Sequence, residues 1–406
     1  MKKILFLAGR YYPKASPNSI CIRNIIDSLP KEEYEVSIIC YKDGLDEIDS
    51  RRVYKISRGV IQSVLYKLEN SQSASSKKMM SVFNYLSKVK QVPFYPVWPW
   101  TDPIFTLKEY ITARKLHKVE HFDIIVSAYV PLSSVIVGHA LKRFDPDVMF
   151  VAYFLDSLTG GAVPRFIKPE KFEKKAKKWE RILLGNADRI IFMNASRQHH
   201  DDIYSKSSLY SRITYLDLPV LRKTQPYEKT DDQALIVYVG SLTPSVRSPE
   251  YFLKVFSLVP DPTWKLLFVG DNSCAILNEY ARRDKRITVL GRCSHKEALA
   301  YEQRATVLLN IGNNNPNLTP SKVLEYISFG KKIVSTYPID NESSLSYLRK
   351  YPLACLLDER CPECDAAKAL SEFVSLPTKG IQYPSLKQMY YMNTPEAFIQ
   401  IISSKK

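Results

Sequence analysis

Residues 310–336 combine a predicted anion-binding helix start with a carboxylate about one turn further along the helix. An apolar run at 307–311 predicts a buried strand, a polar loop follows it, and Pro320 suits a first helical turn, where a missing backbone donor costs nothing. The N–H groups at this start lie at the positive end of the helix dipole, which favours an anion by about 0.3–1 kcal/mol. A nucleotide diphosphate fits such a site, with the first amides of the helix as ligands: Ser321, Lys322, Val323 and Leu324.

Glu325 is expected on or near the face of Ser321, where its carboxylate can accept hydrogen bonds from the two vicinal hydroxyls of a ribose. Gly330 is expected to end the helix, and Lys331 and Lys332 to neutralise its negative end. The alternative interpretation is an ordinary loop, helix and strand of an α/β domain.

Composition indicates a globular protein of two or three domains, since the 406 residues are 45% hydrophobic. The apolar run at 4–8 is too short for the core of a signal peptide and predicts a first buried strand. No membrane-spanning segment is expected, because the longest weakly polar stretch is interrupted by Pro131 and two serines. Seven scattered cysteines suggest a reducing, cytoplasmic location.

The positive charge predicts an anionic partner, since 58 Lys and Arg against 42 Asp and Glu give a net charge of +16. The cations concentrate at 165–181 and at 77–100, and the second segment also carries large apolar and aromatic residues. Such a combination suits peripheral contact with an anionic membrane, here the inner face of the cell membrane. Core aromatics beneath a solvated lysine face are the alternative.

Apolar runs recur at spacings suited to intervening helices, which is typical of parallel sheets wound by helices. Two series are present: 4–8, 36–40, 124–128, 148–154 and 189–193, and then 235–239, 265–269, 287–290, 307–311 and 332–335. We therefore expect two doubly wound halves, residues 1–221 and 234–389, joined by a linker at 222–233. Open α/β sheets bind ligands at the carboxyl ends of their strands, so both domains are expected to face one central cleft.

Loops after predicted strands carry further candidate ligands. Gly240 and Ser241 follow the strand at 235–239, and Arg247 in the same loop could bind a diphosphate through two guanidinium N–H groups. Asp156 follows the strand at 148–154 and could accept from a sugar hydroxyl or take a proton. An exposed arginine without a ligand and an aspartate that caps the next element are the structural alternatives.

The sequence gives little support for a metal site or for other catalytic motifs. Residues 199–202 (HHDD) have no metal-ligand spacing and are expected to form a polar helix face. Residues 145–147 (DPD) match the D-x-D of metal-dependent sugar transfer, but they precede a strand, so turn chemistry explains them better. The sequence contains no P-loop, G-x-G-x-x-G or G-x-S-x-G, and no metal or other cofactor is expected.

Residues 320–326 (PSKVLEY) with 330–334 (GKKIV) resemble the donor-nucleotide motif of the GT-B glycosyltransferases of family 4 and related family-1-like sequences. Residues 267–271 are similar to the second strand of that family's C-terminal domain, and 291–305 to its segment beside the donor base. The resemblance covers most of the chain. It implies two Rossmann-like domains, an acceptor-binding domain at 1–221 and a donor-binding domain at 234–389, with the final segment, 390–406, packing back on the first.

The resemblance further implies retaining, metal-independent transfer of a sugar from a nucleoside-diphosphate sugar to a saccharide or lipid-linked acceptor, in surface polysaccharide or glycolipid biosynthesis. Arg247 and Asp156 are then the catalytic residues, and Glu325 holds the ribose. Asn317 and Thr319 lie in the donor-binding segment, and Asn317 stands where the family usually has the first Glu of its E-x7-E motif. Gly240-Ser241-Leu242 replaces the usual G-R-L.

Two other functions compete with transfer. A nucleotide-sugar epimerase of the same fold would convert its substrate without an acceptor. A non-catalytic protein that binds acidic membranes or other polyanions would show salt-dependent binding without nucleotide selectivity, although nucleic acid is not the expected partner.

Overall fold

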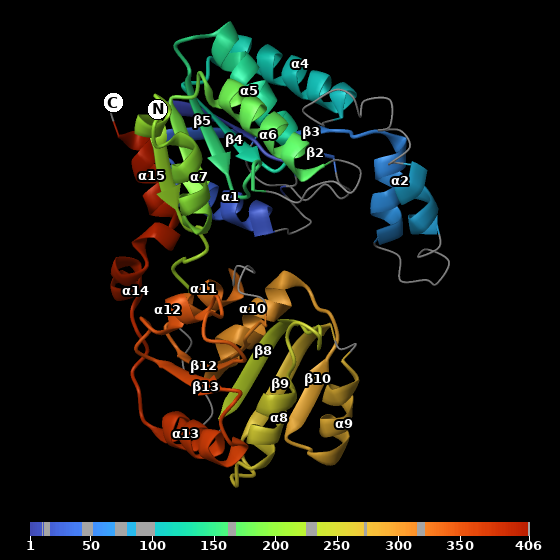
Figure 1. The fold of residues 1–406 in the computed structure, drawn as a ribbon, viewed down its shortest axis with the longest axis vertical. Coiled ribbons are helices and arrows are strands. Elements are labelled where there is room, and N and C mark those ends of the chain that lie inside the picture. The colour runs from blue at the N-terminus through green and yellow to red at the C-terminus, as the bar shows by residue number, and fades with distance from the viewer. Residues whose placement is uncertain are drawn as a thin grey trace. The chain divides into compact units, whose positions relative to one another are not determined.

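The computed structural model describes residues 1–9, 11, 17–42, 52–69, 79–86, 102–160, 168–224, 234–271, 274–314 and 321–404. These residues form two compact units, Met1–Pro219 with Pro395–Lys406, and Val220–Thr394 (Figure 1). We call them unit 1 and unit 2 and describe each by itself. The predicted linker falls mostly outside the described residues, as do residues 77–78 and 87–100 of the predicted membrane-contact segment.

Unit 1 contains a seven-stranded parallel sheet in the order β3-β2-β1-β4-β5-β6-β7. Its strands are β1 (Lys2–Leu7), β2 (Tyr34–Tyr41), β3 (Arg52–Ile56), β4 (Ile124–Tyr129), β5 (Met149–Phe154), β6 (Arg189–Met193) and β7 (Ile213–Leu216). Its helices are α1 (Pro17–Ser28), α2 (Val60–Glu69), α4 (Pro103–Glu120), α5 (Leu132–Phe144), α6 (Pro169–Leu184), α7 (Arg197–Tyr204) and α15 (Pro395–Ser403).

The inner strands of unit 1 are apolar along their length because helices cover both faces of the sheet. All residues of β5 after Met149 are buried, for example. Helix α5 packs on β4 and β5 and contacts both α4 and α6. Helix α15, drawn in red, lies beside α1 (Figure 1), and the ring of Phe398 lies 5.0 Å from that of Tyr153 in β5.

Unit 2 contains a six-stranded parallel sheet in the order β10-β9-β8-β11-β12-β13. Its strands are β8 (Leu235–Ser241), β9 (Lys265–Asp271), β10 (Ile287–Leu290), β11 (Val307–Ile311), β12 (Lys332–Tyr337) and β13 (Ala354–Asp358). Its helices are α8 (Glu250–Ser257), α9 (Ala275–Arg283), α10 (His295–Arg304), α11 (Ser321–Ser328), α12 (Leu345–Leu348), α13 (Glu363–Ser375) and α14 (Tyr383–Met389). The predicted fold class, two doubly wound parallel-sheet domains, is confirmed.

Lys331 and Lys332, expected to neutralise the C-terminal end of α11, bind the ends of two other helices. The ammonium of Lys331 donates to the carbonyls of Glu302 and Ala305 at the end of α10, the second at 2.9 Å. Lys332 donates to the carbonyl of Val374 at the end of α13, at 2.8 Å. A cation satisfies unpaired carbonyls at any helix C-terminus that it reaches, so tertiary packing decided which helices these lysines cap.

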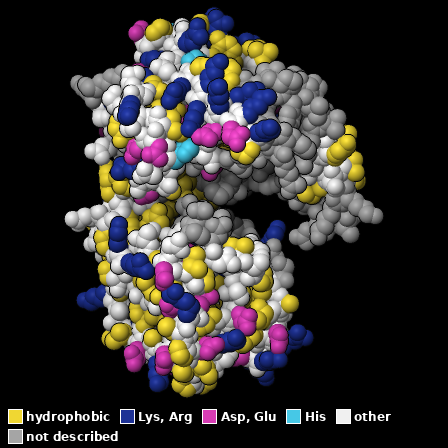
Figure 2. Space-filling view, in the orientation of Figure 1, with side chains coloured by type: hydrophobic (Ala, Val, Ile, Leu, Met, Phe, Trp, Pro, Cys, Tyr) yellow, Lys and Arg dark blue, Asp and Glu magenta, His cyan; other side chains and the backbone are white. Residues whose placement is uncertain are grey.

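Lysines and arginines gather over α4 and α6 on the visible face of unit 1 (Figure 2). Helix α6 buries an apolar face and exposes a basic one, with Lys171, Lys174, Lys178 and Arg181 on it. No helix among the described residues is both long enough and apolar enough to span a bilayer.

Candidate functional site

Helix α11 is held against the end of β8 by Tyr326. The Tyr326 side chain is buried, and its hydroxyl accepts from the Val239 N–H at 2.9 Å and donates to the Val239 carbonyl at 3.3 Å. Val323 and Leu324 are also buried, so their side chains fix the helix on the sheet while the amides of its first turn have no partner within the helix. The predicted ligands Asn317 and Thr319 lie outside the described residues.

Glu325 belongs to a charged trio with Lys322 and Glu302, which we call the α10–α11 trio. The Lys322 ammonium lies 2.9 Å from Glu325 Oε2 and 2.6 Å from Glu302 Oε1. Glu302 projects from α10 and is fully buried, whereas the Glu325 side chain retains 18% of its exposure. Glu325 Oε1 is buried and has no hydrogen-bond partner among the described residues, so it is an unsatisfied acceptor beside the predicted diphosphate site.

Arg247 is brought to the segment that follows β11. Its Nε donates to Asn313 Oδ1 at 3.1 Å, and the Asn314 N–H donates to the Val246 carbonyl at 2.9 Å. Arg247 and Lys322 both act electrostatically on the hydroxyl of Tyr238, although burial is the main cause that raises the pKa of Tyr238. The cations at 247 and 322 therefore lie at the same edge of unit 2, where an anion would be stabilised.

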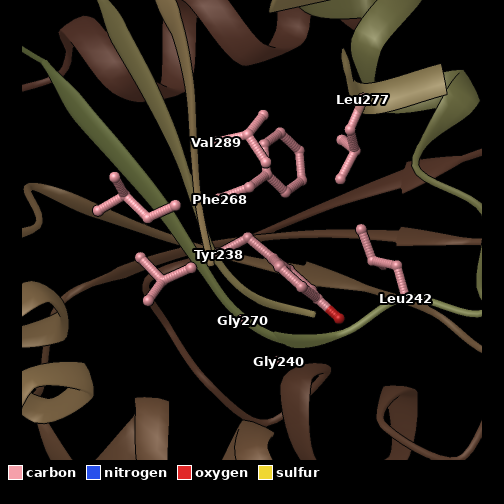
Figure 3. A pocket seen from close by; sticks show the side chains of 9 residues that line it. Tyr238, Gly240, Leu242, Phe268, Gly270, Leu277 and Val289 are labelled. Atoms are coloured by element: carbon pink, nitrogen blue, oxygen red, sulfur yellow. The ribbon is translucent and has the colours of Figure 1, made fainter. Parts of the chain in front are cut away.

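The two predicted donor residues Gly240 and Ser241 form the end of β8, next to a small apolar pocket (Figure 3). Side chains from the carboxyl ends of β8, β9 and β10 and from α9 line it: Tyr238, Phe268, Val289, Leu277 and, after β8, Leu242. Gly270 closes one side, and a Cβ there would lie 2.1 Å from the Gly240 carbonyl oxygen in a backbone with φ of 139°. Only glycine allows β8 and β9 to approach so closely at this point.

In unit 1, Asp156 lies directly after β5 and is exposed. Its Oδ2 accepts from the side-chain amide of Asn18 at the start of α1, at 3.5 Å. The structure thus places Asp156 at the carboxyl end of a central strand, where a ligand can reach it.

The loop after Asp156 is fastened by a buried polar network around Glu180. This carboxylate, on the apolar face of α6, accepts from the Tyr204 hydroxyl at 2.7 Å and from the Thr159 hydroxyl at 3.4 Å. His199 Nε2 lies 2.8 Å from the same Thr159 oxygen. Burial raises the pKa of Glu180 to about 7, because the charged form loses its hydration.

The expectation that residues 199–202 form a polar helix face is wrong for His200. Its ring is fully buried and stacks on Phe192, with 3.7 Å between centroids. Burial lowers the pKa of His200 to about 4, so the ring is neutral. Nδ1 lies 3.0 Å from the Ser196 carbonyl and must carry the proton, which leaves Nε2 to accept from the Ser157 hydroxyl at 3.3 Å.

Glu302 and Glu180 were missed in the sequence, although both carry a signal. Each stands four residues after a buried alanine on the inward face of its helix, Ala298 in α10 and Ala176 in α6. A carboxylate at a core position of an amphipathic helix is expected to have a specific partner. Among the described residues, no group of three or more His, Cys, Asp or Glu is arranged to hold a metal ion. The D-x-D segment is a turn, as expected, in which Asp145 Oδ1 accepts from the Asp147 N–H at 3.0 Å.

Comparison with known proteins gives a family model for part of the chain. Residues 233–345 match the family model "Glycosyl transferases group 1". No curated protein sequence matches the chain.

Solved structures resemble the whole chain at low sequence identity. A glycosyltransferase from Rickettsia africae ESF-5 has a TM-score of 0.58 at 14% identity and covers 100% of this chain and 99% of its own. Anabaena Alr3699/HepE, in complex with UDP and glucose, has a TM-score of 0.54 at 13% identity, with 100% of both chains covered. A putative UDP-N-acetylglucosamine 2-epimerase from Listeria monocytogenes has a TM-score of 0.52 at 12% identity, covering 100% of this chain and 98% of its own.

At such identities, the solved structures establish the fold, and the family model establishes the sequence relationship of unit 2. The predicted resemblance is confirmed. The chain has the GT-B fold, and its residues 233–345 carry the sequence pattern of the group 1 glycosyltransferases.

Proposed function

We propose that this protein is a glycosyltransferase that moves a sugar from a nucleoside-diphosphate sugar to an acceptor hydroxyl. One observation carries the proposal: the segment that matches the family model contains the start of α11, Glu325 and Arg247, and tertiary structure gathers them at one edge of unit 2. Free amides and a guanidinium bind a diphosphate, and an unsatisfied carboxylate oxygen binds a diol.

In the proposed donor complex, the amides of Ser321, Lys322, Val323 and Leu324 and the guanidinium of Arg247 hold the diphosphate. Glu325 Oε1 accepts from the ribose hydroxyls. Asn317 and Thr319 face the transferred sugar, as the family resemblance implies.

We propose that transfer retains the anomeric configuration and requires no metal. The acceptor oxygen forms its bond to the anomeric carbon on the face from which the diphosphate leaves, and the acceptor proton passes to a phosphate oxygen. Arg247 and the helix start stabilise the negative charge that develops on the leaving diphosphate. Asp156, held at the end of β5, faces the sugar or the acceptor and orients a hydroxyl.

We further propose a saccharide or lipid-linked acceptor at the cytoplasmic face of a membrane, in surface polysaccharide or glycolipid biosynthesis. The basic face of α6 supports this proposal, because exposed lysines attract anionic lipids by about 1 kcal/mol each. Binding to vesicles of anionic lipid, and loss of binding with added salt, tests the membrane contact.

The first test is a thermal-shift and calorimetric screen against UDP, GDP, ADP, CMP and their sugar conjugates. The Anabaena structure contains UDP and glucose, so uridine-diphosphate sugars come first. Selective stabilisation by one nucleoside diphosphate is expected, since a ligand that binds only the folded state raises its melting temperature.

Glu325→Ala is expected to weaken donor binding about 10- to 150-fold, because hydrogen bonds to a charged group contribute roughly 1.5–3 kcal/mol. The control is Glu372→Ala, which removes an exposed carboxylate from α13. Unchanged nucleotide affinity in the Glu325 variant would contradict its assignment. Retention is tested by the anomeric configuration of the product, and metal independence by turnover in the presence of a chelator.

Epimerisation is the second candidate, because the Listeria epimerase has the same fold over the full length of this chain. An epimerase acts on the nucleotide sugar alone. Incubating the protein with the donor selected by the screen, without acceptor, separates the two functions: a new isomer favours epimerisation, and an unchanged donor that reacts only with acceptor favours transfer.

A further inference from the structure

We propose that Glu302 and Lys322 are positioning residues for Glu325, and that binding of a nucleoside-diphosphate sugar is coupled to uptake of a proton by Glu302. The inference rests on the proposed donor-binding function of unit 2. It concerns a buried carboxylate that the family resemblance does not explain.

The geometry of the α10–α11 trio fixes the orientation of Glu325. Lys322 and Glu325 are three residues apart on α11, and such a pair alone is weak and adaptable. Glu302 reaches Lys322 from a second helix, at 2.6 Å, and is fully buried. The ammonium is thereby held in one place, it binds Glu325 Oε2, and it leaves the buried Glu325 Oε1 as an unsatisfied acceptor.

The trio carries one charge too many for its surroundings. Two carboxylates share a single ammonium, and Glu302 Oε2 has no hydrogen-bond partner among the described residues. A buried charge without full pairing is costly, so one carboxylate of such a group tends to hold a proton.

The other groups that face Glu302 offset this excess only in part. Arg222 acts on it favourably, while the hydroxyl of Tyr326 is a neutral neighbour. The ammonium of Lys331 binds the main-chain carbonyl of residue 302. Burial, followed by repulsion from Glu325, raises the pKa of Glu302 to about 7 in spite of Lys322 and Arg222.

A bound donor shifts this balance towards the protonated form. Its diphosphate brings two negative charges to the first turn of α11, where Lys322 is located. Added negative charge raises the pKa of Glu302 further, so the complex holds more proton than the free protein near neutral pH. Donor affinity is therefore highest below pH 7. It falls as the pH rises through the pKa of Glu302 in the free protein and then through its pKa in the complex.

The test is the dissociation constant of the nucleotide sugar selected by the screen, measured by calorimetry from pH 6.0 to 8.5. A nucleotide sugar is used because its diphosphate, esterified at both ends, does not titrate in this range. For the wild type we expect affinity to fall by about 3- to 10-fold, since a pKa change of one unit corresponds to a factor of ten. At pH 7.5, binding enthalpies in buffers of different ionisation enthalpy are expected to show uptake of a fraction of a proton.

Glu302→Gln keeps the shape of the side chain without its titration, and Glu372→Gln is the matched control. The Glu302 variant is expected to lose both the pH dependence and the proton uptake, and the control to keep both. Lys322→Met is expected to weaken donor binding at every pH at least tenfold, and Lys322→Arg to restore part of that loss.

Two results would overturn the coupling: binding by the wild type without proton uptake, or an unchanged pH dependence in Glu302→Gln. The first needs no variant and so does not depend on the folding of any mutant. A wild type that binds no nucleotide sugar at any pH contradicts the proposed function itself, and the coupling with it.

Discussion

At the scale of single residues, the candidate donor site depends on side chains with more than one partner. Arg247 binds Asn313 through Nε at 3.1 Å, which orients its guanidinium at the segment that follows β11. Lysine has the same charge but lacks the planar pair of donors that matches a diphosphate. The pair of Arg247 and Asn313 is therefore expected to contribute geometry as well as charge.

Arg247→Lys is expected to weaken donor binding about tenfold with little change in melting temperature, because the loop is exposed and the loss is limited to one bidentate contact. Calorimetric titration of the nucleoside diphosphate measures it. Lys254→Arg, on the neighbouring α8, serves as the control for exchange of the two cations. Equal affinity of Arg247→Lys and the wild type would remove Arg247 from the diphosphate site.

At the scale of secondary-structure elements, the position of α11 depends on Tyr326. Its hydroxyl satisfies both backbone groups of Val239 at the point where β8 approaches its end. Tyr326→Phe leaves a buried N–H and a buried carbonyl without this partner, and such a loss costs about 1–3 kcal/mol. Because the helix start and Glu325 move with α11, donor affinity is expected to fall together with stability.

Chemical denaturation and donor titration of Tyr326→Phe test this prediction, with Tyr301→Phe in α10 as the control. A variant that loses stability but binds the donor normally would show that the tyrosine holds the fold together without positioning the site.

At the scale of the whole molecule, buried carboxylates link stability to pH. Burial raises the pKa of Glu109, Glu180 and Glu302 to about 7 from the usual 4.5. The folded state therefore binds more protons than the unfolded chain between these values, so the free energy of unfolding falls as the pH rises from about 4.5 to about 7 and then levels off. Each group is expected to contribute about 2 kcal/mol to the part of this fall above pH 5.5, since one pKa unit corresponds to about 1.4 kcal/mol.

Urea denaturation at pH 5.5 and 8 measures this effect. Glu180→Gln is expected to lose less stability over that interval than the wild type, because the variant lacks one of the two buried carboxylates of unit 1, Glu109 and Glu180, that ionise near pH 7. Equal losses in both proteins would show that Glu180 ionises without penalty.

The local chemistry of the donor segment was readable in the sequence because it lies within about 20 consecutive residues. The strand at 307–311 was predicted with the bounds that the structure has. The helix was predicted to begin at Pro320-Ser321 and to end at Gly330, and the structure has it at Ser321–Ser328. Inner parallel strands were found as apolar runs, whereas β3, β7 and β13 were missed because short or more polar edge strands bury less apolar surface.

Partnerships across helices and loops were decided only by tertiary structure. Arg247 and Asn313 are 66 residues apart, and Glu302 and Lys322 belong to different helices. Helical periodicity determines which face of a helix is buried, but not which residue of another element packs against it. The sequence alone therefore determined the two wound sheets, the donor helix and its carboxylate. The packing of α10 on α11 and of α6 on α7 decided which carboxylates are buried away from water. Burial in turn decided which of them have a pKa near neutral pH.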